Sequence, residues 1–210
     1  MEQQKDVFYY VTMMNENYAQ PSLPEGVEED LLKGMYRYGD CKADKAVAAA
    51  RLTGSGAILR EIIAAAGKLA QDWNIDVEIW SATSFSELAR DAIETERWNR
   101  LHPLDEQRSC HVKACLGGQM PVIAATDYVR AWPNLIAPYI DAPYTVLGTD
   151  GFGRSDTRSA LRGFFEVDQH HIVLATLHTL AGQGMIARAL CAQAIERYGI
   201  AVDNAAPWAC

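Results

Sequence analysis

The stretch that decides the fold is Gly148-Thr149-Asp150-Gly151-Phe152-Gly153-Arg154-Ser155-Asp156, directly after the apolar run Tyr144-Thr145-Val146-Leu147. The apolar run predicts a buried strand, and the three glycines permit the positive φ angles of a tight bend. Ser155 or Asp156 is then placed to cap a following helix, because both side chains accept hydrogen bonds from a helix's first N–H groups. This order is typical of an open α/β sheet, in which ligands lie at the carboxyl ends of the strands.

Apolar runs alternate with segments of helical spacing on both sides of this stretch. We expect strands over residues 33–38, 47–52, 77–82, 121–125 and 144–148, and helices over 58–73, from 85 through 93, from about 127, and over 157–165, 169–182 and 187–198. Such alternation predicts a mostly parallel sheet with helices on both faces. A short link joins the first strand to the second, so the first strand could run antiparallel. The expected fold is α/β, a three-layer α/β/α unit with a mixed, mostly parallel five-stranded sheet.

One helix start carries a specific signal. Ser84-Phe85-Ser86-Glu87 has the spacing of a capping box, in which Ser84 caps the helix and Glu87 reaches back. The buried stripe of this helix is expected to be Phe85, Leu88, Ala89, Ala92 and Ile93. Pro133 predicts a break in the helix that starts near Asp127.

The first residues differ in pattern from the rest of the chain. Residues 7–18 predict a strand without a nearby partner, and Pro21, Pro24 and Gly26 interrupt the chain after it. We therefore expect residues 1–26 to be a tail or linker that belongs to a preceding domain, and residues 27–210 to form one domain.

Composition limits the classes of partner. The 210 residues are 49% hydrophobic, which is typical of a globular domain. Their net charge of −8 argues against nonspecific nucleic-acid binding, which needs clustered Lys and Arg. No apolar run reaches the length of a membrane helix, and no signal peptide is recognised. The five cysteines are irregularly spaced, which favours reduced thiols in a cytoplasmic protein.

Two short motifs invite a ligand-binding interpretation. Gly54-Ser55-Gly56 follows a strand and opens a helix, but a dinucleotide fingerprint needs a small residue where Leu59 stands, so a tight turn is favoured. Cys110-His111 and Cys115 lie in a segment, 105–119, with no second pair of ligands nearby, so a loop is favoured over a zinc site.

Histidines and charged residues gather on two predicted helices. His171 and His178 share a helix face with His170 nearby, but no carboxylate pair stands beside them at ligand spacing, so we interpret them as core or surface residues. The charged residues of the helix from 85 favour a solvated face, with Arg90 and Glu94 paired, over a subunit or domain contact; they are Glu87, Arg90, Asp91, Glu94, Glu96 and Arg97.

The opening stretch leaves two interpretations. Arg154 near a helix start is placed to hold an anion. Equally, Asp150 and Asp156 are placed to fix Arg154 and the bend. No nucleophile–base pair and no phosphate-binding loop is recognised in the sequence.

Motifs in order along the chain carry a family resemblance. They are Phe8–Thr12, Asn15–Tyr18, Pro24–Gly26, Leu52–Gly56, Thr83–Asp91, Glu96–Asn99, Leu101–Pro103, Thr126–Tyr128, Gly148–Asp156 and Phe165–Asp168. Together they resemble the last domain, and the junction before it, of the homodimeric bacterial pyruvate dehydrogenases. These are the thiamine-diphosphate-dependent decarboxylating components of the pyruvate dehydrogenase complex.

The resemblance implies a three-domain subunit whose first domain holds the diphosphate of thiamine diphosphate with Mg²⁺ and whose middle domain supplies the glutamate that activates the aminopyrimidine. The last domain is implied to be an α/β/α unit of the transketolase C-terminal type that helps the homodimer assemble. Gly39-Asp40-Cys41 departs from the family's Gly-Asp-Gly motif at its third position. No catalytic, cofactor-binding or metal-binding residue is therefore assigned, and the chain alone is expected to bind no cofactor and to be inactive.

The expected function is that of a non-catalytic assembly domain. Its parent would oxidatively decarboxylate pyruvate and acetylate lipoyl groups of the dihydrolipoyl acetyltransferase. The remaining domains and a second subunit are the expected partners, at an interface loop made of Asp150, Gly151, Phe152, Gly153, Arg154, Ser155 and Asp156. The alternative is a stand-alone α/β binding or assembly module derived from that domain; an independent enzyme would need perturbed carboxylates or histidines at the strand ends.

Overall fold

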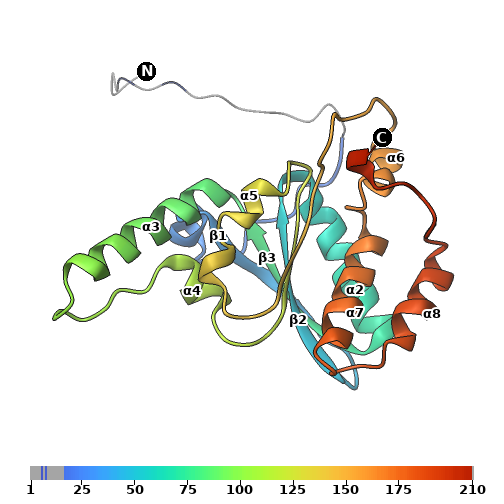
Figure 1. The fold of residues 1–210 in the computed structure, drawn as a ribbon, viewed down its shortest axis with the longest axis horizontal. Helices are drawn as coiled ribbons and strands as arrows, with labels where there is room; N and C mark the ends of the chain where they lie inside the picture. Colours follow the sequence, from blue (N-terminus) through green and yellow to red (C-terminus); the bar gives the residue numbers. More distant parts are fainter. Residues whose placement is uncertain (1–5, 7, 9–16, 210) are drawn as a thin grey trace.

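The computed structural model describes residues 6, 8 and 17–209, which contain a five-stranded sheet in the order β1-β3-β2-β4-β5 (Figure 1). The strands are β1 (Met35–Cys41), β2 (Ala48–Ser55), β3 (Ile75–Ala82), β4 (Val122–Ala125) and β5 (Tyr144–Leu147). The strand predicted over residues 7–18 falls largely outside the described residues.

The sheet is mixed, as predicted. β1 pairs antiparallel with β3, whereas the pairs β2–β3, β2–β4 and β4–β5 are parallel. β2 continues past its predicted end at Leu52, because Thr53, Gly54 and Ser55 stay in register with β3 residues 80–82. That pairing partner lies a helix away in sequence and leaves no local signal in β2.

Helices cover both faces of the sheet and complete three layers (Figure 1). One face carries α2 (Leu59–Trp73), α7 (Gln169–Gly182) and α8 (Ala189–Tyr198), and the other carries α3 (Phe85–Leu101), α4 (His111–Leu116) and α5 (Ala131–Asn134). The shorter elements are α1 (Glu28–Leu32), α6 (Arg158–Phe164), η1 (Gly56–Ile58), η2 (Ala137–Tyr139) and η3 (Pro207–Ala209). The predicted α/β/α architecture is confirmed.

Each face has its own apolar core. On the α2 side, Ile62 and Leu69 pack with strand residues such as Val77 and with Leu177 of α7. On the α3 side, Leu88 belongs to a second cluster that includes strand residues Trp80 and Val122. Burial of these side chains removes apolar surface from water and is the main stabilising contribution to the fold.

The helix predicted from Asp127 begins later and is short. Thr126 Oγ1 accepts a hydrogen bond from the Tyr128 N–H at 3.2 Å, which forms a turn where the helix was expected. The chain becomes helical only over Ala131–Asn134, and α5 ends one residue after Pro133. Pro133 thus lies in the first turn of this short helix, where proline is tolerated, and does not interrupt a longer helix.

Two further predictions were wrong in part. Segment 105–119 was predicted as a loop but contains α4, whose Val112 and Leu116 are buried. In the capping box, Ser84 Oγ accepts from the Glu87 N–H at 3.1 Å, but the Glu87 carboxylate pairs with Arg90 instead of reaching back. The Ser84 N–H donates to the Gly34 carbonyl, so it does not need that partner.

Ile93 departs from the buried stripe predicted for α3. Phe85, Leu88, Ala89 and Ala92 are buried, whereas Ile93 is 57% exposed. In Figure 1, the C-terminal half of α3 projects away from the sheet, so it has less of the sheet to pack against.

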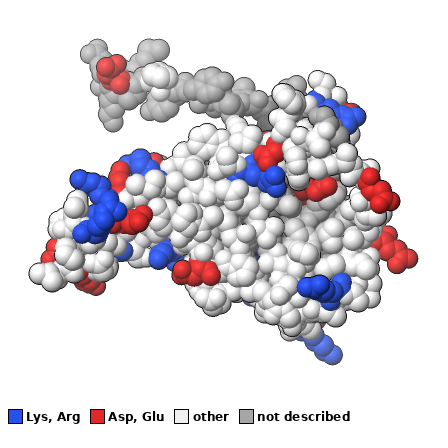
Figure 2. Space-filling model, in the orientation of Figure 1, with Lys and Arg blue, Asp and Glu red and all other residues white. Residues whose placement is uncertain are grey.

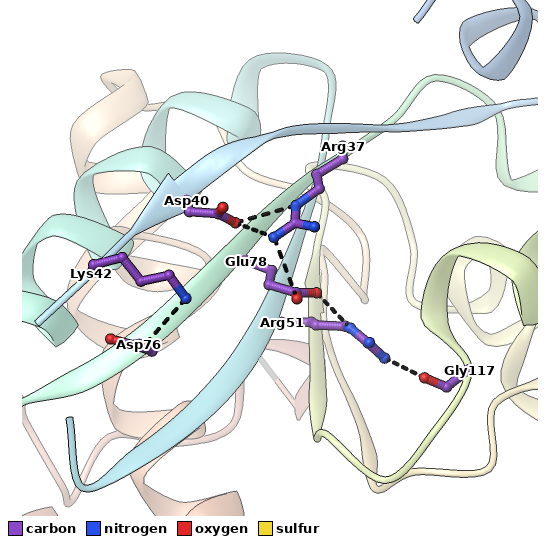
Figure 3. A network of polar contacts seen from close by, with 7 residues as sticks. All are labelled: Arg37, Asp40, Lys42, Arg51, Asp76, Glu78 and Gly117. Atoms are coloured by element: carbon purple, nitrogen blue, oxygen red, sulfur yellow. Dashed lines mark hydrogen bonds and ion pairs between the residues drawn. The ribbon is translucent and has the colours of Figure 1, made fainter.

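Polar contacts cross β1, β3 and β2 (Figure 3). The Arg51 guanidinium lies 2.8 Å from Glu78 and also donates to the Gly117 carbonyl at 2.8 Å. Arg37 reaches Glu78 from β1 and pairs with Asp40. The Arg51 and Glu78 side chains are 13% and 18% exposed, and pairing satisfies charges that would be costly to bury alone.

Candidate functional site

The predicted interface loop, residues 150–156, leaves the carboxyl end of β5. Its base is held by the segment that follows β4, because the Thr149 N–H donates to the Tyr128 carbonyl at 2.9 Å. Gly148 makes this approach possible: a Cβ at its position would lie 2.9 Å from the Tyr128 carbonyl oxygen. Of the three glycines that permit a positive φ, Gly151 and Gly153 take one, at 100° and 79°, and Gly148 does not.

Arg130 anchors the loop. Its backbone N–H donates to Asp150 Oδ1 at 3.0 Å, and its Nε donates to Asp150 Oδ2 at 2.6 Å. The guanidinium also stacks over the Trp208 ring at 4.6 Å, so the C-terminal η3 packs on the same residue. Burial alone would raise the pKa of Asp150, but the Arg130 hydrogen bonds and charge outweigh burial and lower it.

The tip of the loop projects into solvent. Phe152 is fully exposed, and all residues from Gly151 to Asp156 are exposed as well. Arg154 stacks over the Phe164 ring at 4.6 Å and lies 3.9 Å from Asp156. Of the two aspartates expected to fix Arg154, only Asp156 lies near it, because Asp150 binds Arg130 instead.

Thr157 caps the helix after the loop. Its Oγ1 accepts from the Ala160 N–H at 3.3 Å, whereas Asp156 accepts from the Thr157 N–H. The sequence expectation that Ser155 or Asp156 caps the helix was wrong, because the backbone becomes helical only at Arg158.

Three partly exposed aromatic side chains lie after β4 and in η3. Tyr128, Trp132 and Trp208 are each about half exposed. Figure 2 shows charged side chains of both signs at the α3 end and on the side of the C-terminus, with fewer between them. Arg130 and Trp208 were not singled out from sequence, because a contact between residues this far apart has no local signal.

A second candidate is a cavity of about 560 Å³ beside the loop, lined in part by Arg154, Asp168, His170, His171 and Tyr198. Asp168 Oδ1 lies 2.9 Å from His171 Nδ1 and also accepts from the N–H groups of His170 and His171. His170 stacks on the Tyr198 ring at 4.6 Å. Asp168 is therefore the N-cap of α7, and its pair with His171 continues that cap.

The Asp168–His171 pair shifts the pKa of both groups. Burial alone would raise the pKa of Asp168, but hydrogen bonds from His171 and the backbone outweigh it and lower the pKa. Burial alone would lower the pKa of His171, but Asp168 outweighs it and raises the pKa. The lining residues include no serine, threonine or cysteine to serve as a nucleophile, so the pair fits a structural role.

The remaining sequence candidates have structural partners. His111 lies 3.4 Å from Cys115, and its Nε2 contacts the Met35 carbonyl at 2.8 Å. Burial raises the pKa of Cys115 to about 12, which disfavours the thiolate that binds metals. Within the described residues, no group of three or more His, Cys, Asp or Glu side chains is arranged to hold a metal ion.

The glycine at the end of β2 and the charged residues of α3 make contacts within the chain. Gly54 closes β2, and a Cβ there would lie 2.7 Å from Leu59 Cα, so the glycine permits tight strand–helix packing. Arg90 pairs with Glu94 at 3.0 Å on the exposed face of α3, as predicted. No helix within the described part of the chain is long and apolar enough to cross a membrane.

Comparison with known proteins adds the last observations. Residues 34–168 match the transketolase-like TK C-terminal domain family. The chain is 49% identical over 212 residues to the pyruvate dehydrogenase E1 component of Pseudomonas aeruginosa, covering 100% of this chain and 24% of that protein. For the pyruvate dehydrogenase E1 component of Escherichia coli K12, the identity is 43% over 207 residues, 98% of this chain and 23% of that protein.

A solved structure of transketolase from Leishmania mexicana matches 72% of this chain and 18% of its own, with a TM-score of 0.47 and 19% identity. The chain thus spans about a quarter of the length of the curated relatives it matches.

Proposed function

We propose, from the premise that this chain belongs to the transketolase-like C-terminal domain family, that it serves as the C-terminal assembly region of a pyruvate dehydrogenase E1 component. The observation that carries the proposal is the 49% identity to the Pseudomonas aeruginosa E1 component over the whole of this chain. The intact protein would oxidatively decarboxylate pyruvate with thiamine diphosphate and Mg²⁺ in the cytoplasm. It would then acetylate lipoyl groups of the dihydrolipoyl acetyltransferase.

Within that protein, residues 27–210 would form the last domain, and residues 1–26 would belong to the end of the domain before it. The interface would include the loop over residues 150–156 and the neighbouring aromatic side chains. Two features support this location. The loop base is fixed by Arg130, and the loop tip carries the fully exposed Phe152. An exposed aromatic side chain on a loop with a fixed base is a suitable anchor for a partner surface.

The chain's own residues do not fit the diphosphate-binding motif of the implied cofactor. Gly39 and Asp40 lie inside β1, and Asp40 accepts from Arg37 at 2.7 Å. A carboxylate held on a strand by an arginine is a poor ligand for Mg²⁺. We therefore assign this chain no step of the reaction and expect thiamine diphosphate with Mg²⁺ to leave its melting temperature unchanged.

A chimera tests the assembly role. The matched region of the Pseudomonas aeruginosa relative is replaced by this chain, and subunit association and pyruvate decarboxylation are measured. We expect an associated, active protein. A chimera whose isolated domains are folded but which neither associates nor decarboxylates pyruvate would contradict the proposal and favour a stand-alone binding module.

A matched pair of variants tests the loop. Phe152→Asp and Leu104→Asp each place a charge at a nearly fully exposed apolar position, 101% and 97% exposed in turn. We expect Phe152→Asp in the chimera to weaken subunit or domain association by about tenfold or more, as for an interface anchor. Leu104→Asp should leave association unchanged, and equal effects of the two variants would exclude the loop as the interface.

A further inference from the structure

The end of the chain crosses the molecule to reach the interface loop. α8 ends at Tyr198, and Gly199 follows in the left-handed conformation that commonly ends a helix. Residues 201–205 are all exposed, whereas Pro207 in η3 is buried. In Figure 1, this segment runs from the end of α8 to the C-terminus beside α6. A segment that is exposed along its length and buried near its end is held mainly at that end.

Trp208 contacts the anchor of the loop. Its ring centre lies 4.6 Å from the Arg130 guanidinium carbon, and the same guanidinium donates from Nε to Asp150 Oδ2 at 2.6 Å. An arginine that stacks on a ring keeps the N–H groups in its plane free for a carboxylate. The Arg130 and Asp150 side chains are 38% and 25% exposed, so the strength of their pair depends on how well the arginine is held. The Trp208 ring therefore restrains Arg130 in the orientation that binds Asp150.

η3 also approaches the loop backbone. A Cβ added at Gly151 would lie 3.2 Å from both the Pro207 carbonyl oxygen and Trp208 Cα. η3 therefore packs against the first glycine of the loop and leaves little room for a side chain between them. At Gly153, an added Cβ would meet no atom within 4 Å, so the contact is confined to the start of the loop.

From these contacts we propose that the C-terminal segment, residues 200–209, is a strap that holds the interface loop in position, with Trp208 as the positioning residue. The inference rests on the function proposed above, since it concerns the same loop. Trp208 acts on Asp150 through Arg130, and η3 limits the movement of the loop backbone. When η3 leaves, the Arg130–Asp150 pair loses its support, and the loop loosens while the sheet stays folded. A partner would then have to order the loop on binding, which lowers its affinity.

Amide hydrogen exchange of the full 210-residue chain tests the strap without a partner. The Arg130 N–H reports on the loop, because it donates to Asp150 Oδ1 at 3.0 Å. We expect Trp208→Ala to speed its exchange by about fivefold or more, as the loss of a cation–π contact predicts. The reference is the Arg51 N–H, which donates to the Pro121 carbonyl at 2.8 Å and should exchange at an unchanged rate.

Conservative and matched variants separate the effect of the ring from other effects. Trp208→Phe keeps an aromatic ring over Arg130 and should restore most of the slow exchange. Val202→Ala shortens an apolar side chain that is 67% exposed in the same segment, and it should leave the exchange unchanged. Unchanged Arg130 exchange in a folded Trp208→Ala chain would overturn the proposal. An equal rise at the Arg51 reference would also overturn it, because Trp208 would then act on overall stability.

A pair of glycine variants tests the backbone contact. Gly151 and Gly153 both have a positive φ, so alanine strains the backbone at either position. Only at Gly151 does the new Cβ meet η3. In a chain labelled with fluorotryptophan, the fluorine NMR signal of Trp208 is identified by its loss in Trp208→Phe. This signal should shift in Gly151→Ala and stay in place in Gly153→Ala. An unchanged signal in Gly151→Ala would exclude the contact.

Association of the chimera separates this inference from the function on which it rests. Trp208 is itself half exposed, so association alone does not distinguish loss of the strap from loss of a direct contact. Faster Arg130 exchange in Trp208→Ala, together with weaker association in Gly151→Ala but not in Gly153→Ala, would support both proposals. Faster exchange with unchanged association would support the strap and contradict the loop as the interface. Unchanged exchange would overturn the strap whatever the association shows.

Discussion

Arg130 and Asp150 join two connections of the sheet that are 20 residues apart, through a contact of 2.6 Å between Nε and Oδ2. Arg130 follows β4, and Asp150 follows β5. The pair thereby fixes the loop of residues 150–156 against the adjacent strand connection, although the loop tip is fully exposed.

Removal of this pair should loosen the loop. We expect Asp150→Ala to lower the free energy of unfolding by about 1–2 kcal/mol, because two hydrogen bonds to a charged acceptor are lost at a partly exposed site. Urea denaturation measures this change. Trypsin should also cut after Arg154 faster than in the unaltered chain. Asp156→Ala is the control, and equal losses in both variants would argue against the anchor.

The glycine turn after β2 should tolerate no side chain. A Cβ on Gly54 would lie 2.7 Å from Leu59 Cα and 2.9 Å from Ile62 Cγ1, so Gly54→Ala should destabilise the protein by about 3 kcal/mol. Gly67 lies inside α2, where an added Cβ would meet no other atom within 4 Å. Gly67→Ala should therefore stabilise by about 0.5–1 kcal/mol. Thermal unfolding should show a lower melting temperature for Gly54→Ala and a higher one for Gly67→Ala than for the unaltered chain.

The Asp168–His171 pair predicts a pH window of stability. Because the pKa of His171 is raised in the folded state, its contribution to stability is complete below the ordinary histidine pKa. This contribution is lost as the pH rises through the folded-state pKa. Because the pKa of Asp168 is lowered in the folded state, its contribution to stability is complete above the ordinary aspartate pKa. This contribution is lost as the pH falls through the folded-state pKa. The pair should therefore stabilise most between about pH 4.5 and pH 6.

Comparison with His171→Gln tests this window. The melting temperature of the variant should fall furthest below that of the unaltered chain inside the window, and the difference should shrink toward pH 8. A difference that stays constant from pH 5 to pH 8 would show that His171 stabilises only by packing.

The cap of α6 gives a sharp comparison between neighbours. Thr157→Ala removes the acceptor for the Ala160 N–H and should cost about 1 kcal/mol. Ser155→Ala should be nearly neutral, because Ser155 lies two residues before the cap and is exposed. Urea denaturation measures both variants. If Ser155→Ala lowered the free energy of unfolding more than Thr157→Ala, Ser155 would be the cap, as expected from the sequence.

The larger elements could be predicted from the sequence because their periodicity is repeated. The stripe of α2 shows the same face over about four turns, and its apolar residues Ile62, Ala65, Ala66, Leu69 and Trp73 are buried. The short link to β2 left an antiparallel direction open for β1, and β1 is antiparallel, but its place beside β3 depends on pairing across the sheet. No pattern within β1 specifies that neighbour.

Short elements and site contacts were harder to predict. α4 has only six residues, too few for a repeated stripe, so it was expected to be a loop. The choice of Thr157 over Ser155 or Asp156 depends on where the backbone turns helical. The candidate loop was located correctly on a strand end, but its anchor Arg130 meets Asp150 only in the folded chain.

β1 also makes one edge of the sheet unfavourable for pairing with a strand of another molecule. It forms one edge of the sheet, and its register against β3 shifts between Arg37 and Gly39. Charged side chains from Arg37 and Asp40 lie along the same strand. A foreign strand that approached this edge would meet an irregular ladder and fixed charges, both of which oppose edge-to-edge aggregation. The register shift in β1 therefore disfavours the addition of another strand at this edge of the sheet.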